Sequence, residues 1–162
     1  MSLAEHRGGW LIILSFILAI ALNILPLPSA VEIFRPDWVT LTLIYWCLAL
    51  PTRVGVGIGW LVGLLMDVTR DALLGQHALA LAIVAFLTIH LHQRMRVFPI
   101  WQQAMSVFIL VLLENLIVLW LKGLIGQSPG VWNMVASTPA SMLVWPAVFV
   151  LLRHLRRTYH VA

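Results

Sequence analysis

Six long apolar runs, each separated from the next by a short polar or proline-containing break, constrain the fold of this chain more than any other feature. They cover residues 10–27, 36–50, 54–68, 78–91, 100–121 and 132–152. A helix of about 20 apolar residues crosses the hydrocarbon core of a bilayer. Hydrophobic residues make up 62% of the chain and charged residues 10%, against roughly 45–50% and about 25% in soluble domains. The sequence therefore predicts an all-α integral membrane protein, a compact bundle of about six transmembrane helices in a single domain spanning 1–162.

Prolines and polar residues predict where several of these helices begin, end or bend. Pro36 suits the first turn of the second helix, where its missing N–H is no loss. Residues 92–99 are expected to form an interfacial loop, and residues 72–74 could re-enter the membrane. Pro139 and Pro146 are expected to kink the sixth helix. A cleaved signal peptide competes for the first run, but that run is longer than the usual apolar region of about 7–15 residues.

The distribution of basic residues between alternate loops orients the six predicted spans. One side of the membrane receives seven arginines: Arg7, Arg53, Arg94, Arg96, Arg153, Arg156 and Arg157. The other side receives only Arg35, Arg70 and Lys122. Cytoplasmic loops carry the excess of Lys and Arg, so both termini are predicted to be cytoplasmic. The three C-terminal arginines would attract anionic membrane lipid, although a solvated cap on the last helix explains them as simply.

The third run carries glycines at a spacing that predicts close helix packing. Gly55, Gly59 and Gly63 recur every four residues, and Asp67 is the next position on the same helix face. Small residues at this spacing let two membrane helices approach to backbone contact. The stripe is therefore predicted to be a packing seam, for a helix of this chain or of a partner.

Two acidic residues within or beside apolar runs are the strongest candidates for a functional role. Asp67 follows the glycine seam, and Glu114 lies near the middle of the fifth run. A carboxylate at membrane depth must face protein or water rather than lipid. For Asp67 a structural or partner-binding role is favoured over an ion relay. For Glu114 a packing or partner-interface role is favoured, with transport second.

The sequence contains no recognisable signature of catalysis, a metal site or nucleic-acid binding. The histidines form no H-E-x-x-H motif, the serines lack a G-x-S-x-G context, and no phosphate-binding or dinucleotide-binding motif occurs. The basic residues do not form a basic helix face. The chain is therefore predicted to be no enzyme, to hold no cofactor or metal, and to bind no nucleic acid.

Several short motifs, taken in order, resemble those of the rod shape-determining protein MreD family of Gram-negative bacteria. They are Phe34-Arg35-Pro36-Asp37-Trp38, Tyr45-Trp46, Leu48-Ala49-Leu50-Pro51, Arg53-Val54, Gly63 with Asp67, Leu74-Gly75, Trp101-Gln102-Gln103-Ala104 and Trp145-Pro146. The resemblance implies a multi-pass protein of the bacterial inner membrane that takes part in cell-wall elongation, peptidoglycan synthesis and cell shape. It also implies the partners MreC, MreB (directly or indirectly), and RodA with its penicillin-binding transpeptidase, in the assembly called the elongasome.

Two functions remain open at this point. The first is a noncatalytic scaffold that docks MreC and the peptidoglycan synthase. The second is a transporter of a small solute or a lipid intermediate, using Asp67 and Glu114, which predicts a polar, water-accessible pocket between helices. The residues expected to form helix-packing or partner interfaces are Gly55, Gly59, Gly63, Asp67, Arg35, Pro36, Gly75 and Glu114.

Overall fold

The computed structural model describes residues 8–32, 34–70, 73–126 and 131–161, and all its regular elements in these ranges are helices. They are α1 (Gly9–Ile24), α2 (Ser29–Glu32), α3 (Trp38–Ala49), α4 (Val56–Thr69), α5 (Gln76–Val97), α6 (Ile100–Ile125) and α7 (Val131–Thr158). Apart from the short α2, each helix overlaps one predicted run. The all-helical prediction is therefore confirmed for the described residues. Arg7, Asp71 and Ala72 lie outside them.

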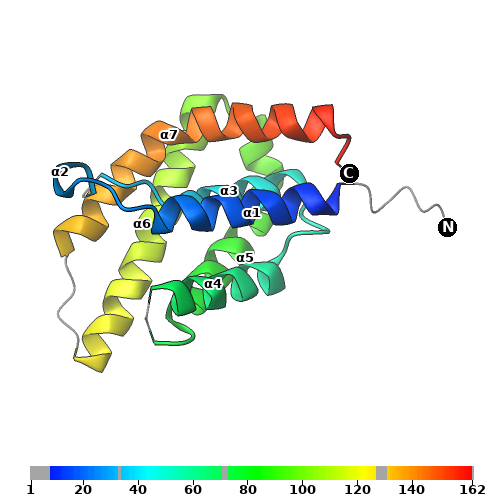
Figure 1. Cartoon of the computed structure of the whole chain (residues 1–162). Helices are drawn as coiled ribbons and strands as arrows, with labels where there is room; N and C mark the ends of the chain where they lie inside the picture. Colours follow the sequence, from blue (N-terminus) through cyan, green and yellow to red (C-terminus); the bar gives the residue numbers. More distant parts are fainter. Residues whose placement is uncertain (1–7, 33, 71–72, 127–130, 162) are drawn as a thin grey trace.

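The short helix α3 forms the centre of the molecule (Figure 1). It contacts α1, α5, α6 and α7, and every residue from 39 to 48 is buried. Trp46 is fully buried, and its indole Nε1 donates a hydrogen bond of 2.9 Å to the hydroxyl of Ser15 on α1. A helix that is apolar on all sides lies in a protein core or spans a membrane. This burial explains how a 12-residue helix finds a place among longer ones.

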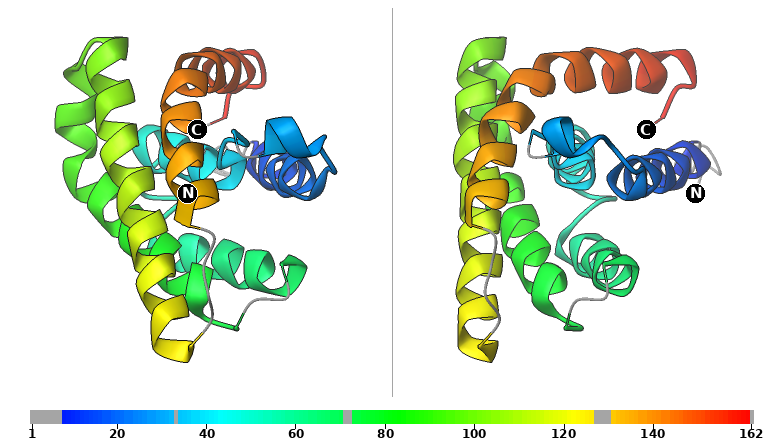
Figure 2. Two further views of the ribbon diagram at one scale, coloured as in Figure 1. Left: turned by 90° about the vertical axis from the view of Figure 1, so that its left-hand side faces the viewer. Right: turned by 60° about the vertical axis from the view of Figure 1, so that its left-hand side comes forward.

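The remaining helices pack around α3 in pairs that follow the chain. The α4–α5 pair has the most extensive contact, followed by α6–α7 and α5–α6. Figure 2 shows α5 and α6 side by side, and shows α7 changing direction strongly along its length. Pro139 and Pro146 lie inside α7, where each removes a backbone hydrogen bond, so the bend is as expected.

Within the described residues, three stretches are long and apolar enough to cross a membrane. They are α5, α6 and residues Val135–Thr158 of α7. The other main helices, α1, α3 and α4, are apolar but have 16, 12 and 14 residues. The number of crossings and their direction stay predictions.

The structure corrects several predicted boundaries. The second helix begins at Trp38 rather than Pro36, because Asp37 provides the first accepting carbonyl, to Leu41 N. The loop expected at 92–99 is wrong, since α5 continues to Val97 and ends before Pro99. Likewise, α6 runs to 125 rather than 121, and α7 to 158 rather than 152. Apolar runs locate the part of a helix that avoids water, whereas Arg and Lys are good helix formers and continue it beyond that part.

The two ends of the described chain meet. Trp10 and Tyr159 make an edge-on ring contact with centroids 5.3 Å apart. Val161 is buried against Gly8, where an added Cβ would lie 2.6 Å from its side chain. Figure 1 shows the C-terminus beside the start of α1.

Candidate functional site

The glycine seam of α4 is filled by α5 of the same chain. A Cβ added at Gly63 would lie 2.3 Å from Ala78 Cα, so the two helix backbones touch there. At Gly59 it would lie 3.0 Å from both Ala85 Cβ and Leu81 O. Gly55 is different, because it precedes α4 and its nearest neighbour would be Ile89 at 3.7 Å. Gly59 and Gly63 therefore serve internal packing and leave no surface for a partner helix.

Asp67 caps the N-terminus of α5 from the neighbouring helix. Its fully buried carboxylate accepts hydrogen bonds from the backbone N–H groups of Gly75 (2.9 Å), His77 (2.8 Å) and Ala78 (3.4 Å), and from His77 Nδ1 (2.8 Å). These backbone groups have no partner inside their own helix, and a negative charge there is favoured by the helix dipole. Gly75 adopts the left-handed conformation at φ 101° that leads into the helix. Asp67 thus has a structural role.

Arg35 caps the C-terminus of α1. Its guanidinium donates to the backbone carbonyls of Asn23 and Leu25, and one nitrogen lies 4.0 Å from Glu32. Cations at helix C-termini satisfy free carbonyls and complement the dipole. Pro36 follows directly, and its carbonyl accepts from Trp38 N at 3.1 Å. These two residues fix the path of the chain from α1 into α3.

Glu114 is buried on α6, and its carboxylate accepts a 2.6 Å hydrogen bond from the Thr40 hydroxyl of α3. Directly before α3, the Asp37 carboxylate accepts a 3.4 Å hydrogen bond from the Ser137 hydroxyl of α7, and the Asp37 backbone N–H donates to the Ser141 hydroxyl at 3.0 Å. Asp37 lies just outside α3. Desolvation raises the pKa of its carboxyl, and the charge of Arg70 acts in the opposite direction. Two carboxyl groups therefore join α3, α6 and α7.

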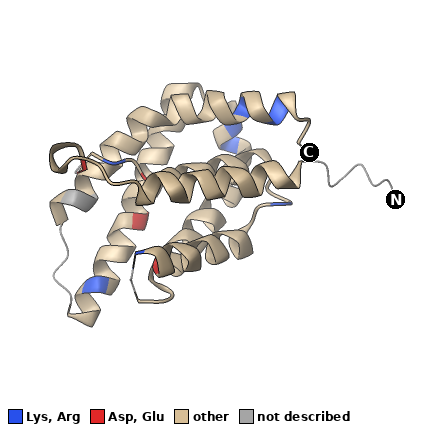
Figure 3. Ribbon diagram, viewed as in Figure 1, with Lys and Arg blue, Asp and Glu red and all other residues tan. Residues whose placement is uncertain are grey.

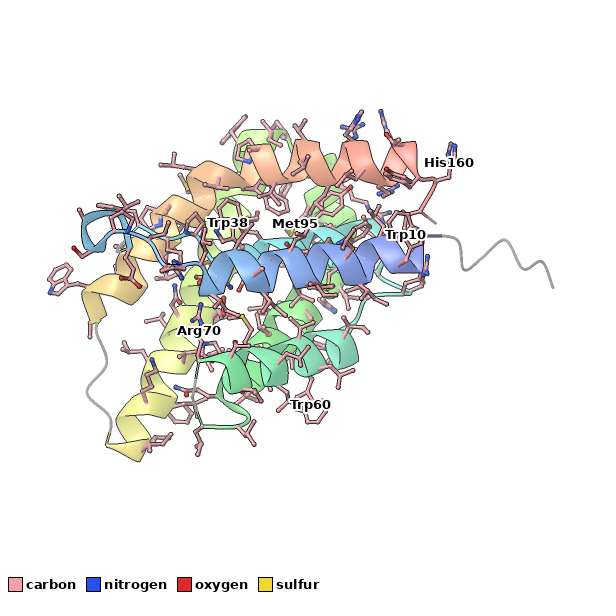
Figure 4. All side chains as sticks on the ribbon, in the orientation of Figure 1. Trp10, Trp38, Trp60, Arg70, Met95 and His160 are labelled. Carbon is pink, nitrogen blue, oxygen red and sulfur yellow. The ribbon has the colours of Figure 1, made fainter. Side chains whose placement is uncertain are left out.

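These carboxyl groups line a polar cavity of about 350 Å³. Three acids, three basic residues, His77 and three uncharged polar residues form its walls: Glu32, Asp37, Glu114, Arg35, Arg70, Lys122, His77, Asn23, Asn115 and Ser137. Figure 4 labels Arg70, which donates toward His77 Nε2 at 3.4 Å. The cavity has equal numbers of acidic and basic residues in its walls, and these walls come from six separate segments of the chain.

The cavity unites residues that the sequence analysis treated separately. Arg35, Arg70 and Lys122 are the three basic residues predicted for the same side of the membrane, and all of them line it. Of the predicted site residues, only Arg35 and Glu114 line it, whereas Asp67 lies behind His77. Sequence reasoning did not single out Asp37, His77, Lys122 or Ser137. The prediction that Arg35, Arg70 and Lys122 lie on one side of the membrane was the sequence signal that pointed to this cavity.

A separate apolar groove of about 330 Å³ lies between α1 and α7. Seven residues of α1 line it, about two in each turn, including Leu11, Leu14, Leu18 and Leu22. Trp38 of α3 and Leu151 of α7 also line it. The residues next to Leu22 and Trp38 in sequence, Asn23 and Asp37, line the polar cavity. The two spaces therefore have sequence neighbours in their walls, although they share no lining residue.

No group of three or more His, Cys, Asp or Glu side chains in the described part of the chain is placed to hold a metal ion. The buried acids are engaged in hydrogen bonds that join helices.

Comparison with known proteins gives matches over most of the chain. A family model described as rod shape-determining protein MreD matches residues 5–155. The rod shape-determining protein MreD of Haemophilus influenzae is 32% identical over 149 residues, which cover 91% of this chain and 92% of that protein. No solved structure matches.

Proposed function

The chain belongs to the MreD family of rod shape-determining proteins, and from that membership we propose that it is a noncatalytic scaffold of the cell-wall elongation machinery. In this proposal it docks MreC and the peptidoglycan synthase formed by RodA and its transpeptidase, and is linked directly or indirectly to MreB. It lies in the bacterial inner membrane and acts by holding these partners together.

We propose that all six main helices cross the membrane, with both termini in the cytoplasm. Two of the three shorter helices do not need to match the bilayer, since α3 is enclosed by protein and α4 is packed along α5. The meeting of the two chain ends supports an even number of crossings. In this orientation the polar cavity opens to the outer face, because Arg35, Arg70 and Lys122 lie there.

The neighbouring positions of the apolar groove and the polar cavity along the chain, at Leu22–Asn23 and at Asp37–Trp38, are the observation that supports the scaffold proposal. MreC is a bitopic protein, with one membrane helix followed by an outer domain. Its helix would lie in the groove beside Leu14 and Leu18, and its membrane-proximal segment would enter the cavity. From Leu11 to Leu22 the groove follows α1 for about 17 Å at 1.5 Å per residue, which is half the thickness of a bilayer.

The balanced charge of the cavity also suits a polypeptide. Three acids and three basic residues line it, so a segment carrying both signs of charge would find partners for each. Hydrogen bonds to charged groups contribute about 1.5–3 kcal/mol each, so a few of them suffice to fix the register of a docked segment. Complementary charges at an interface of this kind select the partner as well as hold it.

Site-specific photocrosslinking in cells tests this placement. A photoreactive residue at Leu18 or Lys122 should crosslink to MreC, because Leu18 lines the apolar groove and Lys122 lines the polar cavity. Ile17 on α1 and Leu124 on α6 are the matched controls. Each is exposed on the same helix as its test position but lines neither the groove nor the cavity. We expect Leu18 to reach the membrane helix of MreC and Lys122 to reach its membrane-proximal segment. Equal crosslinking from lining and control positions would contradict the proposal.

The transporter alternative also predicts a polar pocket, and a polar cavity is present. It gains no support from the family, whose description concerns cell shape. Glu114→Gln distinguishes the two functions, because it keeps the shape of the side chain and an acceptor for Thr40 while removing the charge that coupled transport would use. Under the scaffold proposal, cells carrying this variant remain rod-shaped and MreC still co-purifies, because Glu114 is engaged by Thr40 and the acids Glu32 and Asp37 still line the cavity for a docked segment.

A further inference from the structure

A second polar pocket, of about 380 Å³, lies at the opposite end of the molecule from the cavity described above. Four arginines line it: Arg96 from α5, and Arg153, Arg156 and Arg157 from the last turns of α7. None of the acidic residues in the described ranges lines it. Figure 3 shows blue without red on the terminal part of α7. The pocket is therefore a site of uncompensated positive charge.

The fold holds two of these arginines in position. Arg96 donates from Nε to Leu48 O at 2.7 Å and from Nη2 to Ala49 O at 2.9 Å, which fastens it to the C-terminus of α3. The guanidinium of Arg153 lies 5.9 Å from the centre of the Phe149 ring, a distance typical of a cation–π contact. These cations are thus preorganised around a common space, and less side-chain entropy is lost when an anion binds.

The floor of the pocket contains a buried acceptor without a partner. Gln103 is 5% exposed, and its Nε2 donates to Met95 O at 2.9 Å and to Phe98 O at 3.5 Å. Its Oε1 accepts no hydrogen bond from the described residues. A buried acceptor left unsatisfied costs about 1–3 kcal/mol. A ligand that brings both an anion and a hydrogen-bond donor would satisfy the arginines and Gln103 together.

An apolar groove of about 450 Å³ adjoins the pocket. The two share Arg96, Gln103, Phe149 and Arg153 as walls. Beyond these, the groove is lined by Phe98, Ile100, Pro146 and Val150 of the helix ends and of α7. The basic pocket therefore leads into a surface that would accept hydrocarbon, and a ligand occupying both parts must be amphipathic.

We propose that this pocket binds the headgroup of an anionic phospholipid, represented by phosphatidylglycerol. The phosphodiester oxygens accept hydrogen bonds from the arginines, and a glycerol hydroxyl donates to Gln103 Oε1. An acyl chain lies in the adjoining groove. The site is placed at the cytoplasmic leaflet by the proposed orientation, on which the inference rests, but it does not depend on MreC. An acidic peptide would match the arginines alone and leave the groove unexplained.

Native mass spectrometry of the full-length protein in detergent tests the site by titration with phosphatidylglycerol. Phosphatidylcholine with the same acyl chains and water-soluble glycerol phosphate serve as competing probes. We expect phosphatidylglycerol to bind, phosphatidylcholine to bind at least tenfold more weakly, and glycerol phosphate not to bind measurably. Equal binding of the two lipids, tight binding of glycerol phosphate, or capture of a glutamate-rich peptide in place of lipid would each overturn the proposal.

Two pairs of variants locate the binding. Arg153→Gln removes a charge from the pocket and should weaken phosphatidylglycerol binding about fivefold, whereas Arg94→Gln removes an exposed charge from α5 and should not. Val150→Trp fills the groove and should weaken binding, whereas Leu143→Trp on the same helix should not. Equal effects within either pair would overturn the proposal. Crosslinking of MreC from Leu18 is expected to be unchanged in all four variants, which separates this test from that of the scaffold.

Discussion

Gly63→Ala should destabilise the protein by about 3 kcal/mol, because a methyl group at this position meets backbone rather than side chain. The added Cβ would lie 2.3 Å from Ala78 Cα, and ordinary contact begins at 3.4 Å, so α4 and α5 must separate by about 1 Å. Overpacking of this kind costs about 1–3 kcal/mol. The same movement draws the start of α5 away from Asp67, whose bonds to Gly75 and His77 are 2.8–2.9 Å long. Losing one charge-assisted hydrogen bond adds about 1.5–3 kcal/mol to this destabilisation. The higher helix propensity of alanine than of glycine offsets about 1 kcal/mol of it.

Gly57→Ala is the matched control for this prediction. Gly57 lies on the same helix, and a Cβ there would meet nothing within 4 Å. Only the propensity gain applies, so this variant should be unchanged or stabilised by up to about 1 kcal/mol. The measurement is the free energy of unfolding in mixed micelles, titrated with a denaturing detergent. If Gly63→Ala were as stable as Gly57→Ala, the backbone contact between α4 and α5 would be refuted.

Three further substitutions probe other contacts. Asp67→Ala leaves buried N–H groups at the start of α5 unpaired and should destabilise by about 2–4 kcal/mol, seen as faster amide hydrogen exchange at Ala78; unchanged exchange would contradict the capping role. Arg35→Gln should fray the end of α1, with exchange rising there and not in α6. Ser15→Ala removes the partner of the Trp46 indole and should cost about 1–3 kcal/mol, whereas Ser106→Ala, on α6, breaks only a local bond and should cost less.

The sequence was sufficient to predict the helical class and the approximate place of each main helix, because apolar runs record burial directly. Helix ends were harder to predict where they depend on distant residues. The start of α5 at Gln76 depends on Asp67 of α4, and its last turn is held by Arg96 on the carbonyls of α3. The short α2 was not predicted at all, since four residues carry no periodicity.

The candidate site was only partly predictable for the same reason. Glu114 was recognised because a charge stands out in an apolar run. Asp37 lies at the start of the predicted span 36–50 and was not singled out, because its contact with Ser137 joins residues 100 positions apart. Glycine spacing predicted a seam, but spacing alone does not say which helix fills it. Pairing between distant elements is the information that a single sequence lacks.

The cap that Asp67 makes on α5 has a consequence for the biogenesis of the protein. As synthesis proceeds, α4 emerges first, with 14 residues and an uncompensated carboxylate near its end. Such a segment is a poor substrate for lateral release from the translocon into lipid. Its charge is satisfied only when the first residues of α5 follow, eight to eleven positions later. In the proposed arrangement of six crossings, the two helices are therefore expected to leave the translocon together, as one hairpin.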